Sequence, residues 1–455
     1  MKRIMFQKTF VCLMVLIMAL GLVQKPADAA SAAINVNADA AILVEASTGK
    51  ILFEKNADTS LGIASMTKMM TEYLLLEAIK EGKVKWDQKY TVSADISGLS
   101  HNTSLSNVPL RNGGQYNIED LYHAMAIESA NAAAIAIGQI IGGTNENFVK
   151  MMNDKAKELG MKNYKFVNAT GLNNRDYKGP GYDLAIVGGP EDENVMSAKD
   201  VATLAYRLIN DYPEVLETSS VPTMKFAEGT EDEFKMNNWI KMLDPNSKVY
   251  YEGLDGLKTG TTDLAGPCFT GTAERNGNRF ISVVMNVKHD PTVDSYTARF
   301  NETEKIMNYA FSNFSIKEVL PKNGVLKSNK TIPVDKGKEK SVKIQTNKPL
   351  KIVVENGKEN QYKPKVVLDK KKLTKDGKLT APVKKGEEVG YIKVDSKEKN
   401  DLGYLPNTGK SDAKVSMVTK DAVEKANWFV LSMRAIGGFF GDIWHGITST
   451  IKGWF

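Results

Sequence analysis

Cysteine and histidine are scarce in this sequence, which contains two cysteines and four histidines among 455 residues. Cys12 lies in an apolar stretch near the N-terminus, so Cys268 has no partner for an internal disulfide, and we expect it to be a small buried side chain. The histidines form no H-E-x-x-H pattern, which disfavours a zinc peptidase. A G-x-S-x-G elbow and a glycine-rich phosphate loop are also missing. We therefore expect no metal, no cofactor and no nucleic-acid partner.

Long apolar runs are missing as well. The apolar run "VCLMVLIMALGLV" (Val11–Val23) has 13 residues, which is too short to span a bilayer comfortably. Lys2, Arg3 and Lys8 precede it and small residues follow it, which is the pattern of a secretory signal peptide. We therefore expect residues 1–31 to be a signal peptide and the protein to be exported. An uncleaved membrane anchor is the alternative.

The C-terminal segment, residues 421–455, has an amphipathic helical pattern. Its apolar residues recur every three or four positions and fall within an arc of about 80°. Three formal charges interrupt the part from Phe429 to Trp454, which disfavours a spanning helix. We expect a peripheral anchor at the outer face of the cytoplasmic membrane, and the alternative is a helix docked on the protein's own core. The apolar face consists of Phe429, Met433, Ile436, Phe440, Trp444, Ile447, Ile451 and Trp454, and the polar face of Arg434, Asp442, His445, Ser449 and Lys452.

Residues 32–312 have the pattern of an α+β domain. The stretch Ala40–Asp58 predicts two strands around a Ser-Thr-Gly-Lys turn, and Cys268–Val287 predicts a β-hairpin with Asn276-Gly277 at its turn. Helical patterns dominate between them, so we expect an antiparallel sheet with a helical cluster. The predicted helices are Ser65–Lys80, Ile118–Ile141, Glu146–Leu159 and Ala198–Asn210.

The composition changes after this region. Residues 313–400 contain 23 lysines, no arginine and 11 acidic residues, in short runs that alternate apolar and polar side chains. The alternation predicts a small all-β domain. Its charge would suit anionic wall polymers or lipid headgroups, but a lysine-rich solvated surface explains it equally well. We expect residues 401–420 to be a polar linker.

Three short motifs carry the chemistry. In "GIASMTKMM" (Gly62–Met70), Ser65 and Lys68 lie one helical turn apart, within hydrogen-bond reach. A lysine acts as a base only when burial or a second cation lowers its pKa, so another lysine should point at Lys68. The second motif, Ser129-Ala130-Asn131, interrupts an apolar helical run, and the third, Lys258-Thr259-Gly260, lies on a predicted strand before the hairpin. Each motif is weak alone, but the ordered set is specific.

In this order, the three motifs resemble those of the active-site-serine penicillin-binding proteins and β-lactamases. The sequence is most similar to low-molecular-mass D-alanyl-D-alanine carboxypeptidases over nearly its whole length, including "FVNATGLNN" (Phe166–Asn174) and the C-terminal anchor. The resemblance implies a penicillin-binding α+β domain followed by an all-β domain. It also implies that the enzyme removes the terminal D-alanine from peptidoglycan stem peptides through an acyl-enzyme, and that β-lactams inhibit it covalently.

The resemblance also implies a role for each motif residue. Ser65 would be the nucleophile, Lys68 its general base, and Ser129 the relay of a proton to the leaving D-alanine. The substrate-binding residues that it implies are Asn131 for the substrate amide, Lys258 as the second cation, Thr259 and Arg299 for the terminal carboxylate, Gly260 on the strand along which substrate lies, and Thr261, whose backbone N–H would form an oxyanion hole with that of Ser65.

Two other functions remain as alternatives. A class A β-lactamase would need an E-x-x-L-N loop between the second and third motifs, and none occurs there. A non-catalytic wall-binding surface protein is suggested by "LPNTG" (Leu405–Gly409), which resembles a sorting signal. The segment that follows it is mostly polar rather than a spanning apolar run, so we expect an ordinary loop.

Overall fold

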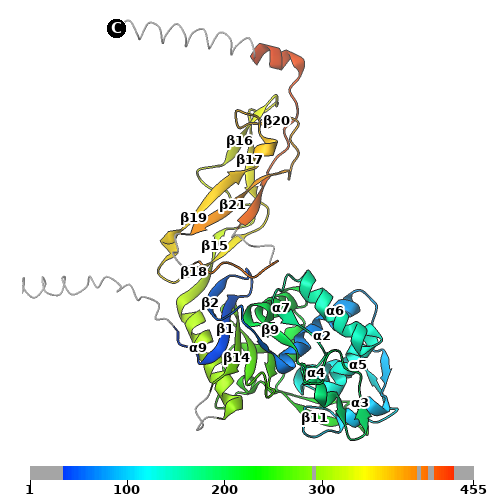
Figure 1. Ribbon diagram of the computed structural model, residues 1–455. Coiled ribbons are helices and arrows are strands. Elements are labelled where there is room, and N and C mark those ends of the chain that lie inside the picture. The colour runs from blue at the N-terminus through cyan, green and yellow to red at the C-terminus, as the bar shows by residue number, and fades with distance from the viewer. Residues whose placement is uncertain (1–33, 289–293, 397–400, 408–413, 435–455) are drawn as a thin grey trace, which may run out of the picture. The chain divides into compact units, whose positions relative to one another are not determined.

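The computed structural model describes residues 34–288, 294–396, 401–407 and 414–434 (Figure 1). The expected signal peptide and most of the expected amphipathic anchor lie outside the described residues. The predicted fold class is confirmed, because an antiparallel sheet with a helical cluster is followed by an all-β domain. Among the described helices, none is long and apolar enough to cross a membrane.

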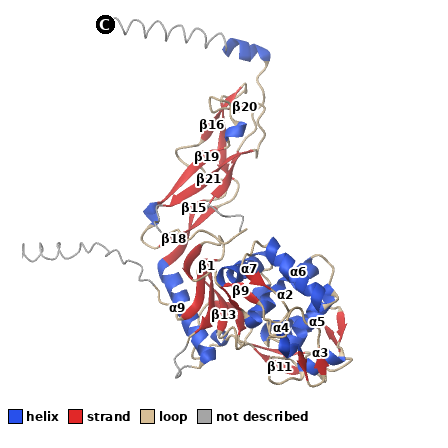
Figure 2. Cartoon of the chain, viewed as in Figure 1, coloured by secondary structure: helices blue, strands red, loops and turns tan. Residues whose placement is uncertain are grey.

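A five-stranded antiparallel sheet forms the centre of the first domain (Figure 2). Its strand β1 is buried at nearly every position instead of alternating, because helices pack on both faces of the sheet. Figure 1 shows α9 (Ser295–Asn313) on one side and α7 (Ala198–Asp211) on the other. The strand order is β12 (Leu254–Gly260), β13 (Cys268–Arg275), β14 (Asn278–Val287), β1 (Ala38–Glu45) and β2 (Ile51–Lys55), which leaves β12 at an edge.

The predicted strands and hairpin of this sheet are confirmed. The two strands expected in Ala40–Asp58 are β1 and β2. Asn276 and Gly277 both have positive φ, 52° and 73°, as a two-residue hairpin turn requires. Cys268 is fully buried, as predicted.

A helical cluster packs against the sheet around α2 (Lys68–Lys80). This helix is buried on all sides, because it contacts four other helices of the domain. The short strands β3 (Ser60–Gly62), β9 (Val195–Ser197) and β6 (Tyr164–Lys165) form a small sheet beside it. The other helices and short strands are α3 (Ala94–Ser100), α4 (Ile118–Ile127), α5 (Asn131–Gly142), α6 (Asn145–Glu158), α8 (Val215–Ser219), β4 (Lys89–Thr91), β5 (Gln115–Asn117), β7 (Lys178–Gly179), β8 (Tyr182–Asp183), β10 (Thr223–Phe226) and β11 (Phe234–Asn237).

The helix predicted over Ile118–Ile141 is wrong in one respect, because it is two helices. α4 ends at Ile127 and α5 begins at Asn131, and Ser129 between them has a φ of 61°. The backbone N–H and the side-chain amide of Asn131 both donate to the carbonyl of Ser106, which pins the start of α5 to a distant loop. Periodicity could not reveal this break, because both helices are apolar and buried.

The all-β domain consists of a two-stranded and a six-stranded sheet. β15 (Phe314–Leu320) begins directly after α9 and pairs with β18 (Leu350–Glu355). The second sheet has the order β19 (Tyr362–Leu368), β21 (Glu388–Ser396), β22 (Lys414–Thr419), β17 (Ser341–Thr346), β16 (Thr331–Asp335) and β20 (Leu379–Thr380).

The polar linker expected at residues 401–420 is wrong. Its second half is β22, which pairs with β21 on one side and β17 on the other in the middle of the sheet. β22 alternates exposed and buried residues, a period-two pattern too short to stand out among charged neighbours. Val423 and Ala426 are also buried, so the domain continues past residue 420.

The first half of this stretch, Asp401–Asn407, binds to the first domain and is called the strap below. The backbone N–H of Ile51 donates to the carbonyl of Gly403, and that of Leu405 donates to the carbonyl of Gly49. The Leu405 side chain is 2% exposed and belongs to the hydrophobic core around α2. The first residue of the LPNTG stretch is therefore part of a packed core.

The strap makes a stability prediction. Replacing Leu405 by Ala should lower the free energy of unfolding by about 2–4 kcal/mol, because it leaves a cavity in the core. Leu402→Ala is the matched control, since Leu402 is 39% exposed on the same strap, and it should cost about 0.5 kcal/mol or less. Urea unfolding of the mature chain measures both, and equal losses in the two variants would contradict the packing of the strap.

Candidate active site

The three motifs meet at one cleft of about 160 Å³. Ser65 lies on the short helix η1 (Ala64–Thr67), which runs directly into α2. Lys68 and Lys258 lie behind the lining, 1% and 5% exposed. Seven of the nine predicted site residues line the cleft, namely Ser65, Ser129, Asn131, Thr259, Gly260, Thr261 and Arg299.

Lys68 is held by three hydrogen-bond partners from three parts of the chain. Its Nζ lies 2.9 Å from Ser65 Oγ, 2.7 Å from Asn131 Oδ1 and 2.9 Å from the carbonyl oxygen of Thr170. Asn131 is itself oriented, because its Nδ2 donates to the carbonyl of Ser106 at 2.9 Å and so turns Oδ1 toward Lys68. The amine therefore faces two oxygens that can only accept and one hydroxyl that can also donate.

This geometry determines what a neutral Lys68 does. A neutral amine has two N–H groups and one lone pair, and the two carbonyl oxygens take both N–H groups. The lone pair is then directed at the Ser65 hydroxyl. Burial, reinforced by the charge of Lys258, lowers the pKa of Lys68 well below its ordinary value, which favours this neutral form.

Lys258 is the second cation that the sequence analysis required. It lies on the edge strand β12, and its Nζ is 3.4 Å from the carbonyl oxygen of Thr259. Burial lowers the pKa of Lys258 to about 7, although a nearby carboxyl group, that of Glu72, acts in the opposite direction. Lys258 thus acts on Lys68 through charge from behind the cleft.

Gly260 is needed for close packing as well as for access to the strand. A Cβ at this position would lie 2.6 Å from the carbonyl oxygen of Ile63, just before the turn that carries Ser65. The absent side chain therefore lets β12 approach η1, and this brings Thr259 and Thr261 next to Ser65. The sequence analysis considered only the room left for substrate.

Arg299 is buried and binds mainly the protein itself. Its Nη1 donates to the carbonyls of Gly260 and Cys268 at 2.9 and 3.0 Å, and its Nη2 donates to Thr261 Oγ1 at 2.7 Å. The guanidinium thus fixes the end of β12 and orients the Thr261 hydroxyl. It also lines the cleft, where its charge favours an anion.

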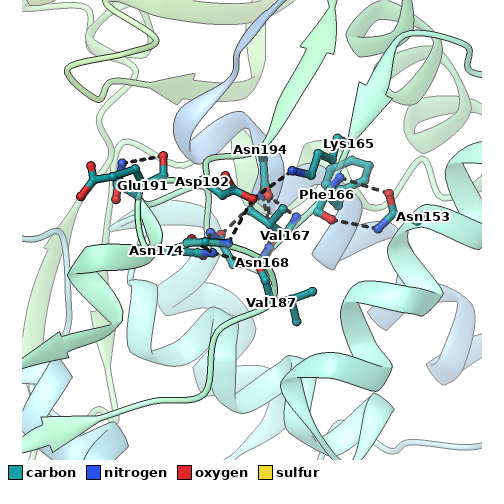
Figure 3. A network of polar contacts seen from close by, with 12 residues as sticks. Asn153, Lys165, Phe166, Val167, Asn168, Asn174, Val187, Glu191, Asp192 and Asn194 are labelled. Carbon is teal, nitrogen blue, oxygen red and sulfur yellow. Dashed lines mark hydrogen bonds and ion pairs between the residues drawn. The ribbon is translucent and has the colours of Figure 1, made fainter.

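The stretch Phe166–Leu172, which delivers the Thr170 carbonyl to Lys68, is positioned by asparagine side chains (Figure 3). Asn194 Oδ1 accepts from the backbone N–H groups of Val167 and Asn168, and Asn168 Oδ1 accepts from those of Thr170 and Gly171. Asn194 Nδ2 donates to Thr67 Oγ1, one residue before Lys68. The sequence analysis quoted "FVNATGLNN" without a role, because a backbone carbonyl leaves no signature in residue type.

The family models match both domains. The model described as D-alanyl-D-alanine carboxypeptidase matches residues 26–289, and that of the penicillin-binding protein 5 C-terminal domain matches residues 314–425. The chain belongs to the D-alanyl-D-alanine carboxypeptidase family. It is therefore a serine-type D-Ala-D-Ala carboxypeptidase, as the motifs predicted.

Relatives of this carboxypeptidase align over most of its length. It is 30% identical to D-alanyl-D-alanine carboxypeptidase DacF of Bacillus subtilis, over 88% of this chain and 89% of the relative. It is also 30% identical to DacC of Escherichia coli, over 92% and 90%. Among solved structures, a peptidoglycan synthesis regulatory factor (PBP3) from Streptococcus pneumoniae superposes with a TM-score of 0.74 at 33% identity, covering 86% of this chain and all of that one.

Gly171 of this carboxypeptidase supplies a test of the Thr170 contact. Gly171 has a φ of 85°, and a Cβ there would lie 1.8 Å from the carbonyl oxygen of Ala64. Gly171→Ala should displace the Thr170 carbonyl and lower kcat on a D-Ala-D-Ala peptide by about 10²-fold. Gly181→Ala is the matched control, because Gly181 has a φ of 84° with open space around it. Gly181→Ala should lower only the free energy of unfolding, by about 1–2 kcal/mol, because alanine is strained at positive φ. Similar kcat values for the two variants would contradict the role of the Thr170 contact.

Proposed function

We propose that the carboxypeptidase removes the terminal D-alanine of peptidoglycan pentapeptide stems with Ser65 as nucleophile and Lys68 as general base. The observation that carries this proposal is the Lys68 amine, whose two N–H groups are taken by Asn131 and Thr170 and whose lone pair faces Ser65. The cleft suits such a substrate. Its charged lining residue is Arg299, and no carboxylate side chain lines it among the described residues, so it favours a peptide that ends in a carboxylate.

The acylation step moves one proton twice. Lys68 accepts the Ser65 hydroxyl proton while Oγ attacks the carbonyl carbon between the two D-alanines. The backbone N–H groups of Ser65 and Thr261 stabilise the resulting oxyanion, and Thr259 and Arg299 bind the terminal carboxylate. Ser129 then relays the proton from Lys68 to the leaving D-alanine nitrogen as the C–N bond breaks. Water then attacks the ester carbonyl carbon, the bond from that carbon to Ser65 Oγ breaks, a proton of the water returns to Oγ, and the shortened peptide is released.

A β-lactam would enter the same cleft and acylate Ser65. Its amide opens as the peptide amide does, but its leaving group stays covalently attached and blocks the approach of water. Membership of the D-alanyl-D-alanine carboxypeptidase family supports this inhibition, because the matched residues 26–289 contain the three motifs that meet at the cleft. The proposed partners are thus stem peptides as substrate and β-lactams as covalent inhibitors.

Acylation by benzylpenicillin tests the roles of Ser65 and Lys68. Intact mass of the mature protein should show a persistent adduct of one drug molecule in the wild type and none in Ser65→Ala. Lys68→Ala should slow adduct formation by about 10²–10⁴-fold while thermal unfolding remains cooperative, because the base is lost. An unchanged rate of adduct formation in Lys68→Ala would contradict the assignment of Lys68 as the base. Rapid loss of the wild-type adduct, together with destruction of the drug, would favour the β-lactamase alternative.

We also propose that the C-terminal helix anchors the enzyme peripherally at the outer face of the cytoplasmic membrane. The described start of this helix, residues 428–434, exposes Trp428, Phe429 and Met433 by 77%, 59% and 54%. Arg434 donates to the carbonyls of Gly337 and Lys338 and so ties the first turns to the all-β domain. Exposed aromatic side chains at the start of an amphipathic segment support a helix that lies in a membrane interface.

Truncation tests the anchor. A chain that ends at Asn427 should remain folded and active but lose sedimentation with anionic phospholipid vesicles, since it keeps the buried Val423 and Ala426 and loses the amphipathic segment. Replacing Trp428 and Phe429 together by Ala in the mature chain should weaken sedimentation by about tenfold or more. Undiminished sedimentation of the truncated chain would contradict the proposed anchor.

A further inference from the structure

Two aromatic side chains, Trp239 and Tyr296, line the cleft although they lie outside the three motifs. Trp239 lies two residues after β11, and Tyr296 lies in the first turn of α9. Their rings contact each other, with centroids 6.1 Å apart and planes inclined by 30°. Tyr296 is 48% exposed, so part of its ring is available for contact with a substrate. The mechanism above uses neither side chain.

Trp239 adjoins the turn that carries Ser129. Its indole Nε1 donates to the carbonyl oxygen of Glu128 at 3.1 Å, and Glu128 directly precedes Ser129. The side chain of Glu128 ties the same two segments together a second time, because its Oε2 accepts from the backbone N–H of Asn237 at 2.7 Å. Asn238 is buried, and its Nδ2 donates to two carbonyl oxygens at the end of α8 and just beyond it. The indole is therefore held beside the proposed proton relay.

Tyr296 adjoins Arg299, which lies almost one turn further along α9. The guanidinium carbon of Arg299 lies 5.1 Å from the centre of the Tyr296 ring, a distance at which a cation is attracted to the face of an aromatic ring. Arg299 Nε also donates to the Tyr296 carbonyl oxygen at 3.2 Å. The guanidinium is itself fixed to groups at the end of β12 and the start of β13. The ring is therefore held beside a group proposed to bind the terminal carboxylate.

The leaving D-alanine lies between these two places. In the proposed mechanism its nitrogen receives a proton from Ser129, and its carboxylate binds to Thr259 and Arg299. Trp239 adjoins the first of these positions, Tyr296 adjoins the second, and the two rings contact each other. The Cα atom and the methyl group lie between the nitrogen and the carboxylate of the same residue. We therefore expect both to lie against the wall that the two rings form.

We propose that Trp239 and Tyr296 determine the specificity for the last residue of the substrate, because their rings leave room for a methyl side chain and exclude a larger one. This inference rests on the roles proposed above for Ser65, Ser129 and Arg299. An apolar wall contacts the methyl group of D-alanine favourably, whereas a longer side chain has to displace a ring that is held by its neighbours. The cleft is small, at about 160 Å³, which agrees with a small terminal residue.

The test compares two peptides as substrates of the mature protein. One is diacetyl-L-lysyl-D-alanyl-D-alanine, and the other ends in D-leucine instead of the last D-alanine. The measured quantity is the ratio of kcat/KM for the D-leucine peptide to kcat/KM for the D-alanine peptide. Trp239→Ala and Tyr296→Ala should each raise this ratio by about tenfold or more, because the wall is opened. Damage to the catalytic groups lowers both values of kcat/KM and leaves their ratio unchanged, so a general loss of activity cannot imitate this result.

Two variants serve as controls. Tyr296→Phe keeps the ring and should keep the wild-type ratio. Leu105→Ala removes another apolar side chain that lines the cleft, next to Ser106, whose carbonyl holds Asn131 on the side of the general base. Whatever this variant does to either rate alone, it should leave the ratio at the wild-type value.

The outcomes separate this inference from the proposed function. Wild-type hydrolysis of the D-alanine peptide, together with a wild-type ratio in both alanine variants, would overturn this inference alone. Equal use of the two peptides by the wild type would also overturn it. Failure of the wild type to hydrolyse the D-alanine peptide would overturn the proposed function and this inference together. If Trp239→Ala does not fold, Tyr296→Ala decides the question, because its side chain is half exposed.

Discussion

The active site depends on a lysine amine buried among acceptors that come from distant parts of the chain. The Lys68 side chain is almost completely buried. Its hydrogen-bond partners lie on η1, at the start of α5 and in the stretch before Leu172. Removing an amine from water is favourable only when each of its hydrogen-bonding positions is satisfied. The α4–α5 break and the asparagine network both serve this purpose, because one presents Asn131 and the other presents Thr170.

Much of the fold and the residues of the site could be predicted from the sequence. Reactive side chains are visible as residue types at fixed spacings, so the three motifs could be identified from the sequence, and seven of the nine predicted residues line one cleft. Hairpin turns and amphipathic periods are equally local signals. The Thr170 carbonyl was missed because every residue has one, and β22 was missed because its pairing partners lie far away in sequence.

Small residues allow close packing around Ser65. Gly260 and Gly171 each bring one backbone segment against the turn that carries Ser65. Arg299 then fixes the end of β12 through carbonyl groups on two neighbouring strands. These contacts hold the motif residues around the cleft, as is expected of a site that stabilises charge by preorganisation.

The position of β22 has a consequence for how the protein is made. β22 comes from residues near the C-terminal end, yet it lies in the interior of the six-stranded sheet, between β21 and β17. The chain is synthesised from its N-terminus, so β21 and β17 lack the strand between them until Thr419 has been added. Unpaired strand edges favour association between chains. Until β22 has been synthesised, the edges of β21 and β17 that it covers are open to such association.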